Sequence, residues 1–284
     1  PDETVLMPTH GAGSFCSVVE GAGRVSTLGQ ERRSNPLLRF EDEDEFARWF
    51  PTTFPAAPSY FARLRPINQH GPRLRRDVRM PPSLEPEQFD SVRKRALIVD
   101  ARPMGEFARS HVPGALSNPF RPVFGVWLGW LVPPDTPVAF IVEEALLGQV
   151  LEESMQVGHE DFAGWLDGGM EAWIDAGLPV SAIEQVDPEQ TRQAIRSGAV
   201  VIDVREPAEF AGGHLPGAMH LPLGEVGPRA GDLPRGMPLV AYCGHGERAS
   251  SAASLLERAG LGPLVTMPGG VGAWKEAGYP VEHG

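Results

Sequence analysis

Residues 239–249 read Leu-Val-Ala-Tyr-Cys-Gly-His-Gly-Glu-Arg-Ala. The first four are apolar or aromatic, as expected for a strand buried on both faces. After the glycine-containing loop, small and apolar residues recur at i, i+3, i+4 and i+7, which predicts one buried face of a helix: Ala249, Ala252, Ala253 and Leu256. The stretch is therefore a strand, a loop and a helix, with Cys243 at the carboxyl end of the strand, where ligands of parallel α/β sheets bind.

The residues upstream predict another helix and another buried strand. Asp187 is a good N-cap, Pro188 suits the first helical position, and Gln190 completes a capping box. Residues 199–204 form an apolar, β-branched run, which again indicates a buried strand. Strands that alternate with helices predict a parallel α/β sheet.

This pattern occurs twice in the chain. Short motifs from one region return 103 residues later: Asp100-Ala101-Arg102 and His111-Val112-Pro113-Gly114-Ala115 become Asp203-Val204-Arg205 and His214-Leu215-Pro216-Gly217-Ala218. Near the end of each copy, Gly168-Gly169 and Trp173 match Gly269-Gly270 and Trp274. We therefore predict two tandem domains of ordinary size at residues 81–182 and 183–284, each a parallel sheet flanked by helices, preceded by a separate region at residues 1–80.

The loop after Cys243 combines three features that attract negative charge. Gly244 and Gly246 let the backbone curl so that N–H groups point inward. The next helix directs its positive N-terminal end at the same place. Arg248 adds a permanent charge, and the combined field favours the thiolate of Cys243. The alternative, a small buried apolar cysteine, does not account for these neighbours.

The first copy lacks this loop. Aligning residues 137–142 with residues 238–243 places Val142 where Cys243 stands, and Glu143 and Glu144 enter where glycines would follow. We expect this domain to be inert. Its Trp127 and Trp130 either form a docking surface for another domain or fill its own core.

The second copy resembles a rhodanese domain. The resemblance covers the last hundred residues and rests on the Cys-x-x-Gly-x-Arg loop, the Asp-Val-Arg strand end, the His-Leu-Pro-Gly-Ala segment and the terminal Gly-Gly and Ala-Trp motifs. It implies that Cys243 takes a sulfane sulfur from thiosulfate or a persulfide and passes it to sulfite, a thiol or cyanide. Arg248 would orient the anionic substrate, Asp203 and Arg205 would support the site, and the persulfide would be held by Gly244, His245, Gly246, Glu247 and Ala249.

Two other functions remain open. Rhodanese-like folds also host cysteine phosphatases and arsenate reductases, but cysteine phosphatases place five residues between the cysteine and the arginine, whereas four separate Cys243 from Arg248. The third hypothesis is a non-catalytic scaffold. The altered loop of the first copy favours it there, and the intact loop of the second copy argues against it.

The region at residues 1–80 is similar to the C-terminal part of metallo-β-lactamase-fold (αββα) enzymes of the glyoxalase II and persulfide dioxygenase branch. The residues that carry this are residues 5–16, residues 26–36 and residues 60–72. The resemblance implies a truncated fusion whose parent oxidises a persulfide to sulfite. The chain has no His-x-His, and His10, which matches a second-metal histidine, cannot build a site alone. We therefore expect no cofactor and no metal-dependent dioxygenase or hydrolase activity, with Fe or Zn bound only if the rest of that domain is present.

Bulk properties limit the partners. The net charge of −12 argues against nucleic acid and anionic membranes. The longest apolar run, residues 123–132, is too short to span a bilayer. Two cysteines, Cys16 and Cys243, are too few for a disulfide framework and favour a cytoplasmic protein. The expected partners are small anionic sulfur compounds, together with self-association through the N-terminal region and the inactive domain.

Overall fold

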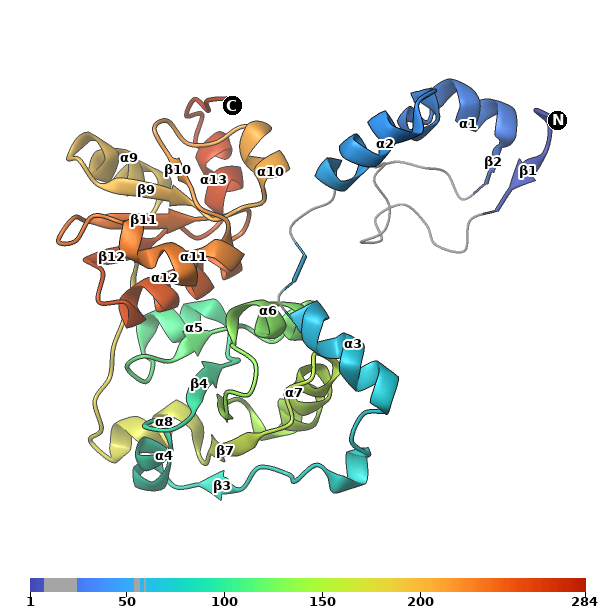
Figure 1. Cartoon of the computed structure of the whole chain (residues 1–284). Helices are drawn as coiled ribbons and strands as arrows, with labels where there is room; N and C mark the ends of the chain where they lie inside the picture. The colour runs from blue at the N-terminus through green and yellow to red at the C-terminus, as the bar shows by residue number, and fades with distance from the viewer. Residues whose placement is uncertain (8–24, 54–56, 59) are drawn as a thin grey trace. The chain divides into compact units, whose positions relative to one another are not determined.

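The computed structural model describes residues 1–7, 25–53, 57–58 and 60–284. The chain divides into two compact units, residues 1–58 and residues 59–284 (Figure 1). His10 and Cys16, with most of the motif at residues 5–16, lie outside the described residues.

The first unit contains one short antiparallel pair and several short helices. Thr27 begins the first helix with a capping box: its hydroxyl accepts from the Gln30 amide at 3.3 Å, and the Gln30 side chain accepts from the Thr27 amide at 2.9 Å. The elements are β1 (Val5–Leu6), β2 (Ser26–Thr27), α1 (Leu28–Ser34), η1 (Pro36–Arg39), α2 (Glu43–Trp49) and η2 (Phe50–Thr53).

The second unit contains two five-stranded sheets. It opens with α3 (Tyr60–His70) and η3 (Arg75–Asp77). The first copy then runs through β3 (Ser83–Leu84), α4 (Pro86–Val92), β4 (Leu97–Asp100), α5 (Met104–Arg109), β5 (Leu116–Ser117), α6 (Phe124–Leu131), β6 (Val138–Ile141), α7 (Glu144–Gln156), β7 (Phe162–Leu166) and α8 (Gly169–Asp175). The second copy runs through β8 (Glu184–Gln185), α9 (Pro188–Arg196), β9 (Val200–Asp203), α10 (Pro207–Ala211), β10 (Met219–His220), α11 (Leu223–Arg229), η4 (Ala230–Asp232), β11 (Leu239–Tyr242), α12 (Glu247–Arg258), β12 (Leu264–Thr266) and α13 (Gly270–Glu276).

The two sheets have the same topology. Their strand orders are β5-β4-β6-β7-β3 and β10-β9-β11-β12-β8, and all these pairs are parallel. In each copy, the third strand of the chain lies at one edge and the first strand lies at the other. The predicted pair of tandem parallel α/β domains is therefore confirmed, and so is the capping box that begins α9.

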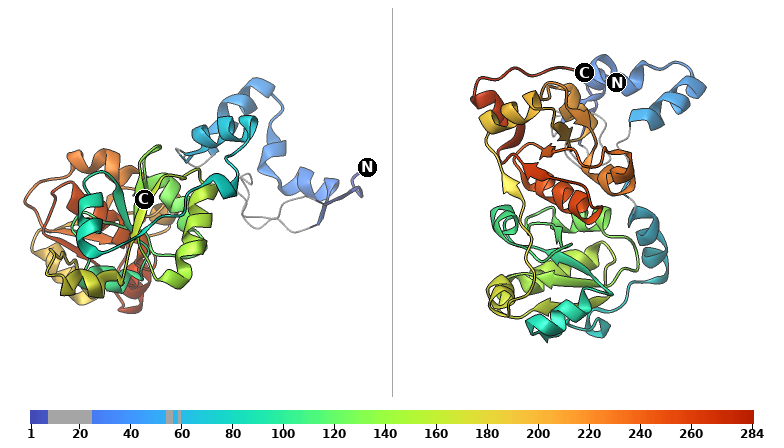
Figure 2. Two further views of the ribbon diagram at one scale, coloured as in Figure 1. Left: turned by 90° about the horizontal axis from the view of Figure 1, so that it is seen from below. Right: turned by 90° about the vertical axis from the view of Figure 1, so that its left-hand side faces the viewer.

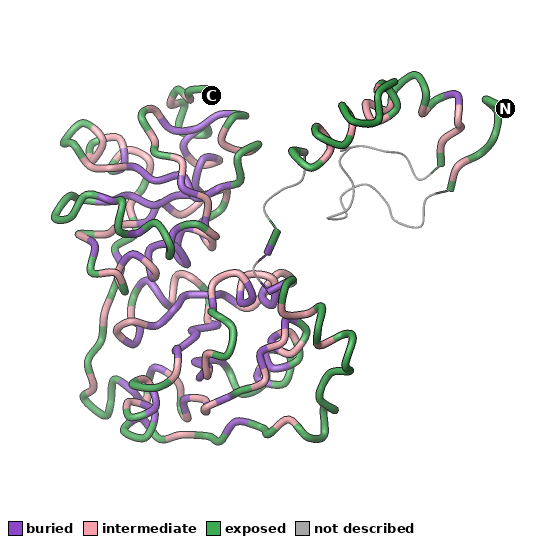
Figure 3. Tube along the Cα trace, viewed as in Figure 1, coloured by how far each residue is buried: buried purple, intermediate pink, exposed green. Residues whose placement is uncertain are grey.

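Helices cover both faces of each sheet, so the central strands are buried throughout (Figure 3). Side chains alternate between the faces of a strand. Along β11, Leu239, Ala241 and Cys243 pack toward α11 and α12. Val240 and Tyr242 pack on the other side with Trp274 of α13. Cys243 thus continues the face of the strand that α12 covers.

Helix α12 is shared by the two copies. Ala249, Ala252 and Leu256 are buried in the core of the second copy, as the sequence pattern predicts. Ala253 instead belongs to a core cluster of the first copy. Figures 1 and 2 show α12 lying along the first copy, beside α5. The helix that follows Cys243 is therefore packed from two sides.

Polar contacts fix the two copies together along this helix. The Ser117 and Ser250 hydroxyls lie 2.8 Å apart, and Ser254 Oγ accepts from the Ser117 amide at 3.0 Å. His111 Nε2 lies 3.0 Å from Glu257 Oε2. These groups are buried or half-buried, so their hydrogen bonds specify the packing as well as stabilising it.

The two tryptophans of α6 take part both in docking to another domain and in the core of their own domain. Trp127 packs against the core cluster of the second copy, and Trp130 packs against the core of the first. The ring of Trp130 also lies against Gly224 of α11, where an added Cβ would come within 2.7 Å of it. The docking partner of this surface is thus the second copy. None of the helices in the described parts of the chain is long and apolar enough to cross a bilayer.

Stability should depend on pH through His159, which lies between α7 and β7. Its side chain is buried, and burial together with the charge of Arg63 lowers its pKa from 6.5 to about 4. Below pH 6.5 the unfolded chain binds a proton that the native chain does not bind. The stability of the native state that depends on a neutral His159 is therefore complete above pH 6.5. It is lost as the pH falls toward about 4, and the loss in unfolding free energy is at most about 3 kcal/mol.

Urea unfolding between pH 4 and pH 7 measures this effect. We expect His159→Gln to reduce the pH dependence of the unfolding free energy, whereas His70→Gln, at an exposed histidine, leaves it unchanged. A full pH dependence in His159→Gln would contradict the assignment.

Candidate active site

Cys243 directly follows β11 and is the first residue of the loop that leads into α12. Only 1% of its surface is exposed. Its Sγ accepts a hydrogen bond from the amide of Gly246 at 3.0 Å. That N–H is at the positive end of α12, where a negative sulfur is stabilised. The predicted juxtaposition of cysteine, loop and helix start is present in the structure.

The loop owes its curl to Gly246. Its φ is +127°, a conformation that side chains disfavour, whereas Gly244 does not have a positive φ. The Gly246 carbonyl then accepts from the Ser250 amide at 2.9 Å and so begins α12. The sequence predicts that Gly244 and Gly246 both let the backbone turn inward. In the structure only Gly246 has the positive φ of such a turn.

A second loop is hydrogen-bonded to the cysteine loop. The Val271 amide donates to the Cys243 carbonyl at 2.9 Å, and the Gly269 amide donates to the His245 carbonyl at 2.9 Å. Gly270 lies so close that an added Cβ would be 1.8 Å from the Cys243 carbonyl oxygen. The Gly-Gly motif, which in the sequence supports both the repeat and the rhodanese resemblance, therefore holds the backbone of Cys243.

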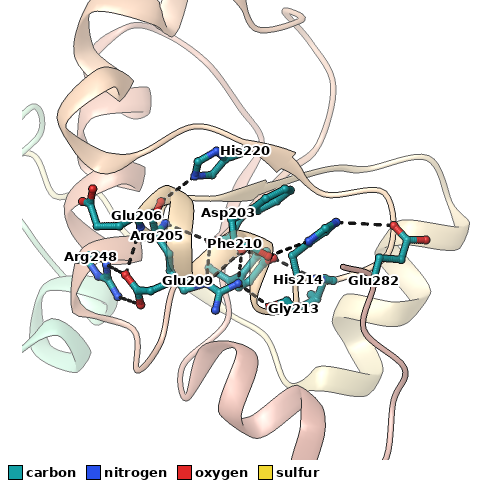
Figure 4. Close-up of polar contacts among 12 residues, drawn as sticks. Asp203, Arg205, Glu206, Glu209, Phe210, Gly213, His214, His220, Arg248 and Glu282 are labelled. Atoms are coloured by element: carbon teal, nitrogen blue, oxygen red, sulfur yellow. Dashed lines mark hydrogen bonds and ion pairs between the residues drawn. The ribbon is translucent and has the colours of Figure 1, made fainter. Parts of the chain in front are cut away.

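Arg248 is held by an ion pair. Its two terminal nitrogens each donate to a carboxylate oxygen of Glu209, both at 2.7 Å (Figure 4). Burial opposes the charge on Arg248, but its hydrogen bonds with Glu209 and the negative charges of Glu209 and Cys243 outweigh this and raise its pKa. The guanidinium lies beside the loop, 3.6 Å from the point where a Cβ on Gly244 would be. In the sequence, Glu209 stands out only as the repeat of Glu106.

Asp203 and Arg205 form a buried pair. Arg205 Nη2 donates to Asp203 Oδ2 at 2.6 Å and to the Gly213 carbonyl at 2.8 Å (Figure 4). The Tyr242 hydroxyl donates to Asp203 at 2.5 Å, and burial, followed by the charge of Asp203, raises the pKa of that hydroxyl. The carboxylate is thereby tied to both an arginine and a tyrosine.

The same buried pair recurs in the first copy. Arg102 Nη2 donates to Asp100 Oδ2 at 2.6 Å and to the Ser110 carbonyl at 2.9 Å. Because that copy has no cysteine, the pair does not depend on sulfur chemistry. The structure therefore places Arg205 with Asp203 in the framework that fixes the strand end.

The other predicted loop residues differ in exposure. His245 is exposed, Gly244 and Glu247 are half-buried, and Ala249 is fully buried. Within residues 1–7, 25–53, 57–58 and 60–284, no group of three or more His, Cys, Asp or Glu side chains is arranged to hold a metal ion.

The equivalent loop of the first copy is shorter. Two residues, Val142 and Glu143, separate β6 from α7, whereas four residues separate β11 from α12. Val142 is buried in the core of the first copy. The first copy therefore lacks the turn that presents an amide to the sulfur, as well as the nucleophile.

The family profile described as "Rhodanese-like domain" matches residues 85–176 and again residues 187–277. The chain belongs to this family. Its two rhodanese-like domains share a fold, and Cys243 belongs to the second.

Known sulfurtransferases resemble about one third of the chain. A thiosulfate sulfurtransferase of Pseudomonas fluorescens is 35% identical over 105 residues, which are 36% of this chain and 94% of that protein. A sulfurtransferase of Allochromatium vinosum is 31% identical over 101 residues, which are 35% of this chain and 94% of that protein. Among solved structures, a metallo-β-lactamase of Staphylococcus aureus is 28% identical, with a TM-score of 0.46, over 58% of this chain and 46% of its own.

The packing of Gly270 on Cys243 can be tested against its counterpart in the first rhodanese-like domain. Gly169 and Gly270 have similar positive φ values, +60° and +52°, but a Cβ on Gly169 would meet nothing within 4 Å. We expect Gly169→Ala to cost about 1 kcal/mol of unfolding free energy through backbone strain alone. Gly270→Ala should cost at least about 3 kcal/mol, because its methyl group would collide with the Cys243 carbonyl. Equal losses in chemical denaturation would contradict this reading.

Proposed function

We propose that the second rhodanese-like domain is a sulfurtransferase whose nucleophile is Cys243. The observation that carries the proposal is the hydrogen bond from the Gly246 amide to Cys243 Sγ at 3.0 Å, at the start of α12. Thiosulfate sulfurtransferases are among the relatives of this chain, which supports the same chemistry. The first domain, which has no cysteine at this position, also has a shorter loop. The longer loop of the second domain is therefore a feature that we assign to the reaction.

In the first half-reaction, the Cys243 thiolate attacks the sulfane sulfur of thiosulfate or of a low-molecular-weight persulfide. The S–S bond of the donor breaks, and its electron pair leaves with sulfite or with the donor thiolate. Cys243 then carries one additional sulfur as a persulfide. The loop amide and the positive end of α12 stabilise the negative charge on this group.

In the second half-reaction, an acceptor attacks the outer sulfur of the persulfide. Sulfite, a thiol and cyanide are acceptors of the required kind. The S–S bond breaks, and its electron pair returns to Cys243 Sγ, which leaves as a thiolate. The Gly246 amide therefore acts twice, first on the attacking thiolate and then on the leaving one.

Arg248 gives the loop its affinity for anions. Because Glu209 fixes the guanidinium in place, Arg248 loses little side-chain freedom when an anion binds beside it.

We place the reaction in the detoxification of sulfide and persulfides. There the acceptor sulfite would come from the oxidation of a persulfide, the reaction implied by the resemblance of the N-terminal region.

Cys243→Ser tests the nucleophile. We expect the wild-type protein to gain one sulfur atom when incubated with thiosulfate and to release it to sulfite or cyanide, because the Cys243 thiolate attacks the sulfane sulfur. The serine variant should gain none. Intact mass spectrometry and thiocyanate formation measure the two steps.

Absence of an adduct with thiosulfate, glutathione persulfide and polysulfide would sink the proposal. Turnover of an aryl phosphate in its place would favour a cysteine phosphatase.

Arg248→Gln tests the anion site. We expect the KM for thiosulfate to rise about tenfold, because a charge-assisted contact contributes on the order of 1.5 kcal/mol or more. The variant also leaves the Glu209 carboxylate unpaired beside the loop. The double variant with Glu209→Gln should therefore recover part of the loss. An unchanged KM in Arg248→Gln would exclude a role in binding the donor.

A further inference from the structure

A side chain of the first domain, that of Met104, lies against Gly246 in the cysteine loop of the second domain. Met104 is the first residue of α5 and is half-buried. A Cβ added to Gly246 would lie 2.7 Å from Met104 Sδ and 2.8 Å from its Cε, and 3.6 Å from the Pro268 Cα. Gly246 is therefore packed between a thioether of the first domain and the backbone of the second.

Gly246 is also the residue whose amide donates to the catalytic sulfur, at 3.0 Å. Hydrogen-bond strength falls steeply as distance and angle depart from their optimum. Glycine adopts a positive φ such as the +127° of Gly246 without a side-chain clash, so contacts with the surroundings support this shape of the loop. The contact with Met104 lies at the place where that support acts.

Helix α5 is itself fixed to the second domain. Phe107 of α5 is fully buried and stacks on His111 with ring centroids 3.9 Å apart. His111 in turn contacts Glu257 of α12 at 3.0 Å. Met104 thus projects from an element that is held against the helix following the loop.

We propose that Met104 is a positioning residue for the sulfurtransferase reaction, acting through Gly246. This inference rests on the proposed function of Cys243. Met104 touches neither the sulfur nor the substrate in this scheme. Its thioether fills the space beside Gly246 and keeps the amide aimed at Sγ, and the first domain contributes to catalysis in this way without a nucleophile.

The effect should be largest when Cys243 leaves as a thiolate. The acceptor attacks the outer sulfur, the S–S bond breaks, and the electron pair moves to Sγ, so the amide is needed most in this step. Binding of thiosulfate depends instead on Arg248. A loss of positioning should therefore reduce the rate of sulfur discharge and leave the KM for the donor almost unchanged.

Met104→Ala and Met104→Leu separate this role from general packing. Alanine leaves a gap beside Gly246, whereas leucine fills a similar volume. With persulfide loaded on the protein, we expect alanine to slow discharge to sulfite about three- to tenfold, and leucine to keep it within about twofold. The KM for thiosulfate should stay within about twofold in both.

Ser117→Ala is the matched control. It removes the hydroxyl contact with Ser250, which lies one helical turn after Gly246 on α12, and it leaves the Met104 side chain in place. We expect it to leave the discharge rate unchanged. Equal slowing in Ser117→Ala and Met104→Ala would show that loosening of the interface is the cause, and an unaltered rate in Met104→Ala would also overturn the proposal.

Hydrogen exchange at the Gly246 amide separates the positioning role of Met104 from the sulfurtransferase function of Cys243. We expect this exchange, followed by NMR, to be at least about threefold faster in Met104→Ala than in the wild type or in Ser117→Ala. If the wild type takes up no sulfur but this difference is present, the proposed function fails and the positioning contact stands. If sulfur transfer is normal and neither exchange nor discharge changes in Met104→Ala, the positioning role fails and the function stands.

Discussion

The packing of α12 between two sheets is the constraint on which the rest of this structure depends. One side of the helix closes the core of the second domain over Cys243, and another side enters the core of the first domain through Ala253. The residues of α12 from 249 to 254 are all alanines and serines, and all of them are buried. The hydroxyls of the buried serines are hydrogen-bonded, either to the backbone of α12 or across the interface, so their burial carries no desolvation penalty of an unpaired group. Ser250 and Ser254 make the bonds across the interface, both with Ser117.

Comparison of the two copies separates framework from chemistry. The strand order, the Asp–Arg pair and the tryptophan that donates to a proline carbonyl occur in both, at Trp173 and Trp274. The cysteine, the longer loop and the ion pair from Arg248 to Glu209 occur only in the second. What the copies share maintains the sheet, and what they do not share surrounds the sulfur.

Much of this could be predicted from the sequence, because strands, caps and glycine turns leave local signals. Residues 199–204 and 239–242 indicate buried strands, and Asp187 with Gln190 indicates the start of α9; all are confirmed. Contacts between distant residues leave no such signal. The bidentate pairing of Arg248 by Glu209, the burial of Arg205 against Asp203 and the approach of Met104 to Gly246 depend on how the sheets and domains pack.

The shared helix also limits how the first domain can change during evolution. A duplicated domain that loses its nucleophile is ordinarily free to accumulate substitutions, provided that it still folds. Here, residues on α5 and β5 form part of the surroundings of α12, so a substitution in one copy alters the packing of the other. A substitution on α5 or β5 must therefore suit the packing of α12 in the second domain as well as the fold of the first, so the two halves of the repeat must diverge in step.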